Sequence, residues 1–181
     1  MKTRLAVLVT GLLLCAGSSW AQIERKDLQI FNDVSDTVNA YSSFTIFDDV
    51  SASVESGNVT LNGKVTQPFK RSDIEKRVEK IDGVRHVTNR IDVLPVSGFD
   101  QELRYRIARS IYGNSNFWNY AIMANPPIHI IVDHGHVTLT GVVQSNVDRM
   151  LARSLATQFG AMSVKNELRT EAEVRSQLEK S

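Results

Sequence analysis

The chain repeats itself, and this internal repeat constrains the fold more than any other feature. Gly57–Val65 and Gly135–Val143 are identical at six of nine positions and share the order Gly-x-Val-Thr-Leu-x-Gly-x-Val. Further along, Gly83–Asn89 aligns with Gly160–Asn166, at nearly the same distance from the first motif. Self-similarity at a fixed spacing is typical of repeated structural units, here two units of about 70 residues.

The first copy alternates between helical and strand patterns. Its first helix is predicted from apolar residues that recur every three or four positions, at Leu28, Phe31, Val34, Val38 and Tyr41. Alternating apolar residues predict a half-buried strand over 50–55 and, after a tight turn at Ser56-Gly57, a second strand over 59–65. A second helical stripe over 74–81 precedes a third strand over 87–93.

The second copy follows the same order. Its first helical stripe consists of Leu103, Ile107 and Ile111. Strands are predicted over 128–132 and 137–143, on either side of a turn at His134-Gly135. Ser145 stands three residues before Asp148, a spacing that predicts a helix cap. The stripe of the helix that follows consists of Val147, Leu151 and Leu155.

These patterns predict an α+β fold with two small repeated domains. Each has the order helix, strand, strand, helix, strand, with two helices packed on a three-stranded sheet. The boundaries are 27–96 for the first domain, 100–170 for the second and 171–181 for a polar tail. The linker Leu94–Gly98 is too short for independent movement, so we expect the domains to pack together. Glycines interpreted as turn or close-packing positions are Gly57, Gly63, Gly135 and Gly141.

The repeated motifs resemble those of the BON domain, a family named after bacterial osmotically induced and nodulation proteins. The resemblance rests on the Gly-x-Val-Thr-Leu-x-Gly-x-Val hairpin, the helix after it and the Gly-Val-x-x-Val-x-Asn entry to the last strand, from about Asp27 to Thr170. The second copy departs from this pattern at Gly160–Met162, where Ala161 replaces the expected Val. The resemblance implies an envelope module linked to osmotic stress, phospholipid surfaces and outer-membrane upkeep, without catalytic residues or cofactors.

The first 21 residues have the pattern of a cleaved secretion signal. A basic start is followed by ten apolar residues, Leu5–Leu14, and Ser19 and Ala21 occupy the small-residue positions of a cleavage site. An apolar run of this length is shorter than the roughly 20 residues that span a bilayer. Leu14 precedes Cys15, and lipoprotein processing requires a small residue there, so we expect a periplasmic protein and no lipid anchor.

Charge and cysteine content exclude several function classes. The net charge of +1 becomes −1 when Lys2 and Arg4 are removed with the leader, which argues against a nucleic-acid-binding protein. Cys15 is the single cysteine, so the processed chain has no disulfide, thiol catalyst or cysteine-ligated metal. Neither a nucleophile elbow nor a phosphate-binding glycine loop is present, and we expect no enzyme activity.

The long connection of the second copy is the candidate contact surface. It contains Phe117, Trp118, Tyr120 and Met123 between the first helix and the first strand. Long connections are often functional, and aromatic residues near arginine suit a bilayer interface. The arginines on the preceding helix are Arg104, Arg106 and Arg109. The alternative is that these aromatic residues belong to a core, which is the usual place for large apolar side chains.

Two other groups of polar residues are interpreted as structural or solvated. His129, His134 and His136 lie close in sequence, but the turn and strand positions do not bring their rings together as metal ligands. The helix after the first hairpin carries Lys70, Arg71, Lys76, Arg77 and Lys80. Acidic residues interrupt this basic series, as is common on a solvated helix face.

The leading hypothesis is a non-enzymatic envelope protein that binds anionic phospholipid surfaces peripherally, in envelope maintenance or stress protection. The alternative is a protein-interaction or holdase module that binds another envelope protein through the same loop or a sheet edge. In either case the first copy supports and orients, and the second copy provides the contact surface. The sequence does not determine the lipid, the client or the oligomeric state.

Overall fold

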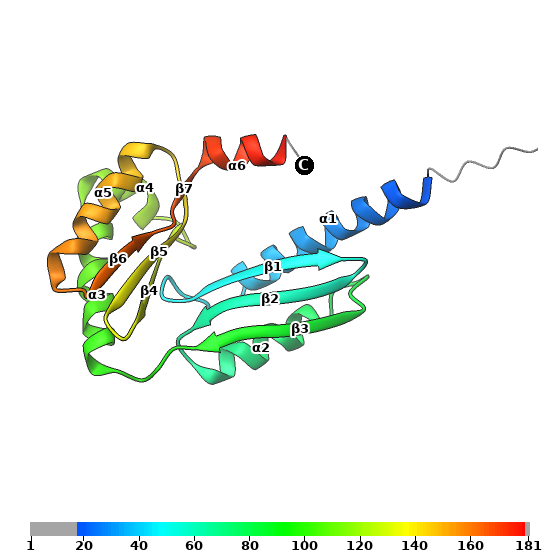
Figure 1. Ribbon diagram of the computed structural model, residues 1–181, viewed down its shortest axis with the longest axis horizontal. Coiled ribbons are helices and arrows are strands. Elements are labelled where there is room, and N and C mark those ends of the chain that lie inside the picture. The colour runs from blue at the N-terminus through cyan, green and yellow to red at the C-terminus, as the bar shows by residue number, and fades with distance from the viewer. Residues whose placement is uncertain (1–17, 180–181) are drawn as a thin grey trace, which may run out of the picture.

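The computed structural model describes residues 18–179, which form two consecutive α+β units (Figure 1). The first unit contains α1 (Ser18–Asn39), β1 (Asp49–Glu55), β2 (Asn58–Val65), α2 (Pro68–Val78) and β3 (His86–Val93). The second contains α3 (Gly98–Tyr112), the 3-10 turn η1 (Ser115–Phe117), α4 (Trp118–Ala121), β4 (Ile128–Asp133), β5 (His136–Val143), α5 (Asn146–Ala156), the 3-10 turn η2 (Thr157–Phe159), β6 (Ser163–Asn166), β7 (Arg169–Thr170) and α6 (Glu171–Leu178). The predicted leader, Cys15 included, lies outside the described residues up to residue 17.

The two units share one topology, as the repeat predicts. In each, an antiparallel hairpin is followed by a helix that crosses over to a strand parallel to the second hairpin strand. Leu61 pairs with Asn89 and Leu139 with Asn166, so the two repeated motifs meet in the same register in both units. The α+β prediction is confirmed, and the second sheet gains one short strand, β7, beside β5.

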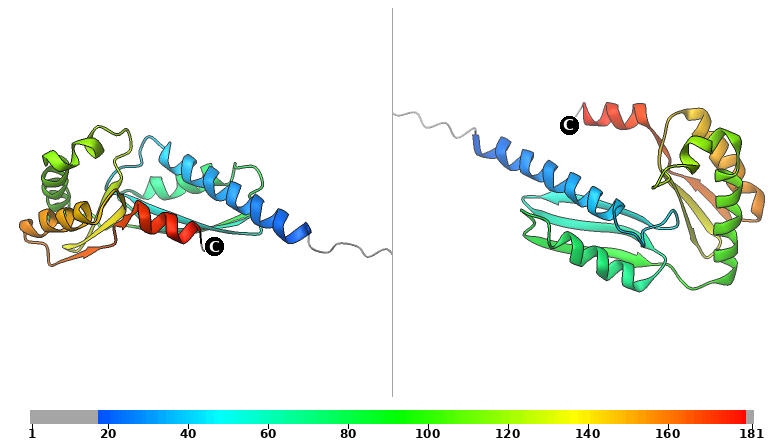
Figure 2. Two further views of the ribbon diagram at one scale, coloured as in Figure 1. Left: turned by 90° about the horizontal axis from the view of Figure 1, so that it is seen from above. Right: turned by 180° about the vertical axis from the view of Figure 1, so that it is seen from behind.

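Each sheet carries its helices on one face, where the core lies (Figure 2). In the first unit α1 and α2 cover the face that presents Val59, Leu61 and Val65, all of them buried. In the second unit α3 and α5 cover the corresponding face, and Phe117 joins that core. Polar side chains alternate with these residues and occupy the opposite face of each sheet.

Two helical stripes differ from the predicted ones. In α1 the buried series is Ile30, Val34, Val38 and Tyr41. The residues spaced four apart from Ile30 to Val38 lie on the side of the helix that contacts the sheet. Leu28 and Phe31 lie off this side and are exposed.

In α5 the small residues Ala152 and Ala156 face the sheet and are fully buried. Their size lets the helix approach the sheet closely, which leaves Leu151 and Leu155 half-buried at its sides. Val147 is exposed, so the predicted stripe is wrong at its first position.

A carboxylate on the first helix of each unit holds the hairpin turn. Asp27 accepts hydrogen bonds from the backbone N–H groups of Ser56 and Gly57, at 2.7 and 2.8 Å. Asp100 is fully buried and accepts equivalent bonds from His134 and Gly135, at 2.9 and 2.8 Å. This repeated contact, which the sequence pattern did not predict, ties the first helix of each unit to the tip of its hairpin.

The four repeated glycines have two different roles. Gly57 and Gly135 occupy the second position of two-residue turns with φ of 78°, after Ser56 and His134, which also have positive φ. Gly63 and Gly141 lie inside strands, where they pair with the first strand of each hairpin. Their φ angles of 136° and 115° bring the backbone so close to the neighbouring strand that a Cβ would overlap a carbonyl oxygen.

The first prediction concerns Gly141→Ala. A Cβ at this position meets the carbonyl of Pro127 in a conformation that L residues rarely adopt. We expect the free energy of unfolding to fall by about 2–4 kcal/mol. Gly98→Ala is the matched control, because no atom lies within 4 Å of its added Cβ. Chemical denaturation of both variants measures the difference, and equal stabilities would contradict the close-approach role.

Candidate functional site

The segment between α1 and β1 packs against both units. Asp48, at its end, is fully buried. Its carboxylate accepts hydrogen bonds from the backbone and hydroxyl of Thr45, at 2.9 and 2.7 Å, and from the backbone and hydroxyl of Thr66, at 2.7 and 2.8 Å. Asp48 thereby fixes the segment against the end of β2.

Asp48 also forms a buried ion pair with Lys70 of α2. The Nζ–Oδ2 distance is 2.6 Å, and the two side chains are 0% and 6% exposed. Burial raises the pKa of the Asp48 carboxyl, but the hydrogen bonds from Lys70, Thr66 and Thr45 outweigh burial and leave the pKa below its ordinary value. The prediction of Lys70 as part of a solvated helix face is therefore wrong, whereas Arg71, Lys76, Arg77 and Lys80 are exposed as expected.

The same segment contacts the second unit directly. The backbone N–H of Ile130 in β4 donates to the carbonyl of Ile46, at 2.7 Å. The Nδ1 atom of His129 lies 2.6 Å from the carbonyl oxygen of Asp48, and the His129 ring packs against Phe44. The two units are thus in contact, as the short linker predicts.

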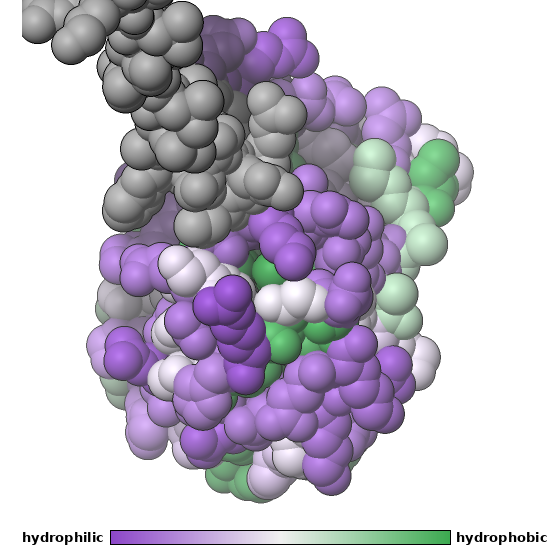
Figure 3. All heavy atoms as spheres, turned by 90° about the vertical axis from the view of Figure 1, so that its right-hand side faces the viewer, coloured by the Kyte–Doolittle hydropathy of each residue, from purple (hydrophilic) through white to green (hydrophobic). Residues whose placement is uncertain are grey.

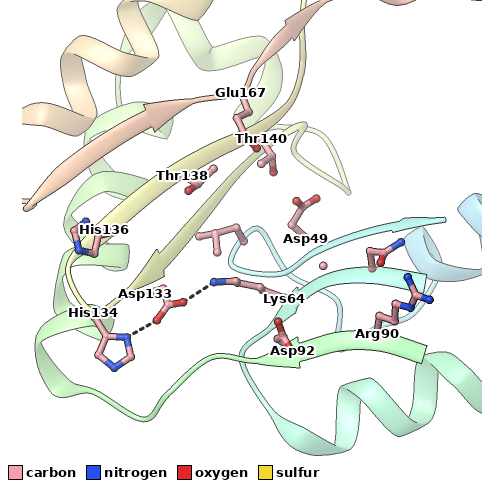
Figure 4. A pocket seen from close by; sticks show the side chains of 13 residues that line it. Asp49, Lys64, Arg90, Asp92, Asp133, His134, His136, Thr138, Thr140 and Glu167 are labelled. Carbon is pink, nitrogen blue, oxygen red and sulfur yellow. Dashed lines mark hydrogen bonds and ion pairs between the residues drawn. The ribbon is translucent and has the colours of Figure 1, made fainter. Parts of the chain in front are cut away.

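A polar cleft separates the open sheet faces of the two units (Figure 4). Its volume is about 580 Å³, and Lys64 of β2 bridges it to Asp133 of β4 at 2.5 Å. Asp49 and Thr140 face the same cleft, and burial raises the pKa of Asp49 above its ordinary value. Across the described part of the chain, no group of three His, Cys, Asp or Glu side chains is arranged to hold a metal ion.

The three histidines of the second unit have separate partners. His129 contacts the first unit, as described above. His134 lies 2.6 Å from Asp133, and His136 lies 2.8 Å from the hydroxyl of Ser163. Their rings therefore do not converge on one point.

The aromatic segment of the second unit is divided between core and surface. Phe117 is fully buried and Tyr120 is 4% exposed, and their rings pack at a centroid distance of 5.8 Å. Trp118, by contrast, is 66% exposed, and Met123 is 45% exposed. The two alternatives from the sequence each hold for part of the segment: Phe117 and Tyr120 belong to the core, and Trp118 and Met123 face outward.

Tyr120 anchors this segment to α5. Its hydroxyl donates to the carboxylate of Asp148, at 3.1 Å, and accepts from the backbone N–H of Gln144, at 2.8 Å. Asp148 also completes the predicted cap with Ser145, because each side chain accepts a bond from the other residue's backbone N–H. A rigid set of hydrogen bonds therefore places α4 at the start of α5.

Exposed apolar side chains occur on α4, directly after it and along α5. We call Trp118, Ile122, Met123, Val147 and Met150 the α4–α5 patch. Trp118 and Ile122 are one helical turn apart, and Val147 directly precedes the Asp148 that binds Tyr120. Apolar side chains of this size that cluster on a surface mark contact sites more often than isolated ones do.

The three arginines of α3 are not equivalent. Arg104 is only 8% exposed, and its Nη2 donates to the carbonyl of Val132 in the adjacent strand, at 2.6 Å. It is therefore unable to meet a surface, contrary to the expectation from sequence. Arg106 is exposed and pairs with Glu102, while Arg109 is exposed in the last turn of the helix.

The far end of the first unit has a different character. Figure 3 shows this end, where the coloured surface is mostly hydrophilic and hydrophobic groups are visible mainly in a central hollow and along one edge. Helices that could cross a membrane, by length and apolarity, are absent from residues 18–179.

A comparison with protein families identifies both repeats. The model of the BON domain matches residues 27–95 and 118–172. The second match begins at α4, so it leaves α3 outside the matched residues. No curated protein matches the chain.

Similarity to solved structures is weak. CdsD, a structural protein of the type III secretion system of Chlamydia trachomatis, is 12% identical, with 84% of this chain and 99% of that chain covered and a TM-score of 0.30. The C-terminal domain of the same protein is 11% identical, with coverages of 79% and 98% and a TM-score of 0.28. Scores this low support no conclusion about function.

The second prediction compares two lysines that pair with aspartates. Lys70→Met leaves the Asp48 carboxylate buried without its cation, and we expect unfolding free energy to fall by about 3–5 kcal/mol. Lys64→Met removes a half-exposed bridge to Asp133, which contributes less than about 1 kcal/mol. Denaturant titration of the two variants measures both effects. Similar losses would show that the buried pair has no special role.

The third prediction concerns pH. The folded pKa of Asp48 is below its ordinary value of 3.8, so its stabilising contribution is present above pH 3.8 and is lost as the pH falls through the lower folded pKa. We expect the stability difference between the wild type and Asp48→Asn to shrink between about pH 5 and pH 2. The exposed Asp92→Asn provides the control in the same urea titrations. A difference that is constant over this range would contradict the assignment.

Proposed function

The chain belongs to the BON-domain family, and from this premise we propose that it is a non-enzymatic envelope module that binds anionic phospholipid surfaces through the α4–α5 patch. BON domains are typically periplasmic and generally lack enzyme activity, in line with the secretion signal expected from the sequence. Envelope maintenance or protection under osmotic stress is the role that we infer for such binding.

The observation that carries this proposal is the fixed exposure of Trp118 on α4. Phe117 and Tyr120, on either side of it, are buried, so the helix cannot turn Trp118 inward without removing them from the core. Trp118 and Ile122 therefore project from a segment that is held in place, and binding through them requires no further conformational change. Tryptophan is favoured at the interface between headgroups and acyl chains, where its ring is partly desolvated.

Basic residues near the patch support an anionic surface as the partner. Arg109 is exposed at the end of α3, just before the connection to α4. Arg153 is exposed on α5, one helical turn after Met150. Exposed arginines next to apolar side chains combine attraction to phosphate with burial of the apolar groups, and salt weakens the first of these terms.

The fourth prediction tests the patch with a double variant. Trp118→Ser with Ile122→Ser should lower binding to phosphatidylglycerol-containing vesicles at least tenfold, since each large apolar side chain contributes about 1.5–3 kcal/mol when it is fully buried. Both side chains are 66% exposed, so the melting temperature should change little. Vesicle flotation at low and high salt measures binding, and circular dichroism monitors the fold.

The matched control replaces two exposed apolar residues elsewhere. Leu28→Ser with Phe31→Ser on α1 removes similar apolar surface, because these side chains are 57% and 42% exposed. The proposal expects normal flotation of this control. Equal losses in both double variants would refute a specific patch, and full binding by the Trp118 variant would show that the vesicles bind another surface of the protein.

A further inference from the structure

The first strand of each hairpin forms one edge of its sheet, because β1 and β4 pair with a strand on one side only (Figure 1). A hydrogen-bonded pair flanks each two-residue turn, and from there every second residue directs its backbone N–H and C=O to the partner strand. The residues between them direct these groups away from the sheet. They are Val50, Ala52 and Val54 in β1, and Ile128, Ile130 and Val132 in β4.

In the second repeat, other segments cover most of this edge. The hydroxyl of Tyr112 donates to the carbonyl of Ile128 and accepts from its N–H, at 2.5 and 3.1 Å. At the other end of the edge, Arg104 donates to the carbonyl of Val132, at 2.6 Å. The N–H at the middle of the edge donates to the carbonyl of Ile46, at 2.7 Å. A segment of the first repeat therefore occupies part of the β4 edge.

In the first repeat, the equivalent edge is uncovered. Within residues 18–179, the backbone N–H and C=O groups of Val50, Ala52 and Val54 form no hydrogen bond with another segment. An edge strand with free backbone groups is a ready site for an added strand, and proteins commonly protect such edges with lysine, proline, a bulge or a short strand. β1 has seven residues, DVSASVE, and contains neither lysine nor proline.

Two positions of the first helix account for the difference between the repeats. Four residues after the carboxylate that holds the hairpin turn, α1 has Phe31 where α3 has Arg104. Twelve residues after it, α1 has Asn39 where α3 has Tyr112. Phe31 has no hydrogen-bond donor on its side chain, and the amide of Asn39 donates to Ser35 instead. The first repeat thus lacks both side chains that cover the edge in the second.

A groove of about 460 Å³ borders the first half of this open edge. Residues of α1 and β1 line one side, among them Phe31, which is 42% exposed, and Val50. Gly141 and its neighbours in the second repeat line the other side. The charged residues that line the groove are Asp49, Glu167 and Arg169. Space and exposed apolar surface are therefore both present beside the free backbone groups.

The opposite edges of the two sheets are partly protected by a repeated asparagine. The side-chain carbonyl of Asn89 accepts from the N–H of Ile91, at 3.1 Å, and Asn166 accepts in the same way from Leu168, at 3.2 Å. Each asparagine therefore binds a backbone N–H that would otherwise be free on β3 or after β6. Within the described residues, β1 is the edge strand on which no outward group has a partner.

The charge around this edge favours a basic partner. From Asp27 to Gly63 the sequence contains six acidic residues and no lysine, arginine or histidine. Asp48 is paired with Lys70, and Asp27 binds the hairpin turn. The remaining four form no ion pair within the described chain and are Asp33, Asp36, Asp49 and Glu55. Two of these four are the first and last residues of β1.

We propose that the edge of β1 binds an extended, basic segment of a partner protein, which adds a fourth strand to the first sheet. Its backbone would pair with the outward groups of β1, its apolar side chains would cover Phe31, and its basic side chains would meet Asp49 and Glu55. A second copy fits less well, because antiparallel pairing of two β1 strands about Ala52 places the like charges of Asp49 and Glu55 opposite each other. This inference is independent of vesicle binding by the α4–α5 patch.

The experiment uses two short synthetic peptides with blocked ends. One alternates valine with lysine, and the other alternates valine with glutamate. Hydrogen exchange of the full protein is followed by NMR while each peptide is titrated. We expect the valine–lysine peptide to slow exchange at the amides of Val50, Ala52 and Val54 in a saturable manner, because these groups gain acceptors. It should bind at least tenfold more tightly than the valine–glutamate peptide.

A proline variant tests the backbone pairing. Ala52→Pro removes the middle outward N–H of β1, a change that edge strands tolerate because no bond to β2 is lost. It should raise the Kd of the valine–lysine peptide at least tenfold. Val93→Pro is the matched control, because it removes an outward N–H from the edge of β3, and it should leave this Kd unchanged. Circular dichroism melts monitor the fold of both variants.

A charge reversal keeps the test decisive if Ala52→Pro does not fold. Glu55 is exposed at the end of β1. Glu55→Lys should weaken binding of the valine–lysine peptide about threefold and strengthen binding of the valine–glutamate peptide by a similar factor. Glu79→Lys, an exposed change of the same charge after α2, should alter neither affinity.

Four outcomes would overturn the proposal. They are unchanged exchange at the three β1 amides, equal affinity for the two peptides, normal peptide binding by Ala52→Pro, and equal peptide affinities of Glu55→Lys and the wild type. Slow exchange at the same amides without peptide, in a dimer detected by analytical ultracentrifugation, would assign the edge to a second copy and would overturn the proposal as well.

Discussion

The buried carboxylate of Asp48 is the interaction on which the arrangement of the two repeats depends. Lys70, Thr45 and Thr66 together satisfy its oxygens, and so they fix the segment before β1 to the end of β2. The backbone of that segment then binds β4 of the second repeat through Ile46 and through the carbonyl of Asp48 itself. A charge buried in the first repeat thereby determines where the second repeat is placed.

The two repeats use one position of their common scaffold for different purposes. Lys70 follows Gly63 by seven residues, and Asp148 follows Gly141 by the same distance, so both occupy the first turn of the second helix of their repeat. Lys70 binds Asp48 and thus supports the junction. Asp148 caps its own helix and binds Tyr120, which holds α4 in place. The same position therefore carries a junction contact in the first repeat and the anchor of α4 in the second.

The sequence predicted the features that depend on local pattern. Residue types a few positions apart predict the hairpins, the turns at Gly57 and Gly135 and the Ser145 cap. The structure contains all of these features. The sequence did not predict the features that depend on contacts between residues far apart in the chain. Lys70 resembles its solvated neighbours until Asp48, 22 residues earlier, is brought beside it.

The exposure of the candidate surface residues also depends on contacts between distant parts of the chain. Composition alone could not separate Trp118 from Phe117, because the division depends on how η1 and α4 pack against the second core. Arg104, Arg106 and Arg109 all lie on one helix, yet of the three only Arg104 is buried against the sheet. The helical period places it beside the buried Leu103 and Ile107, a signal that was present in the spacing.

Hydrogen–deuterium exchange with and without anionic vesicles tests the central claim most directly, because it maps contact over the whole chain. The account predicts that vesicles slow exchange in α4 and in the first turns of α5, around Trp118 and Met150, and leave the edge strand β3 unchanged. Slower exchange along β3 with no change in α4 would contradict it and would assign the contact to a sheet edge.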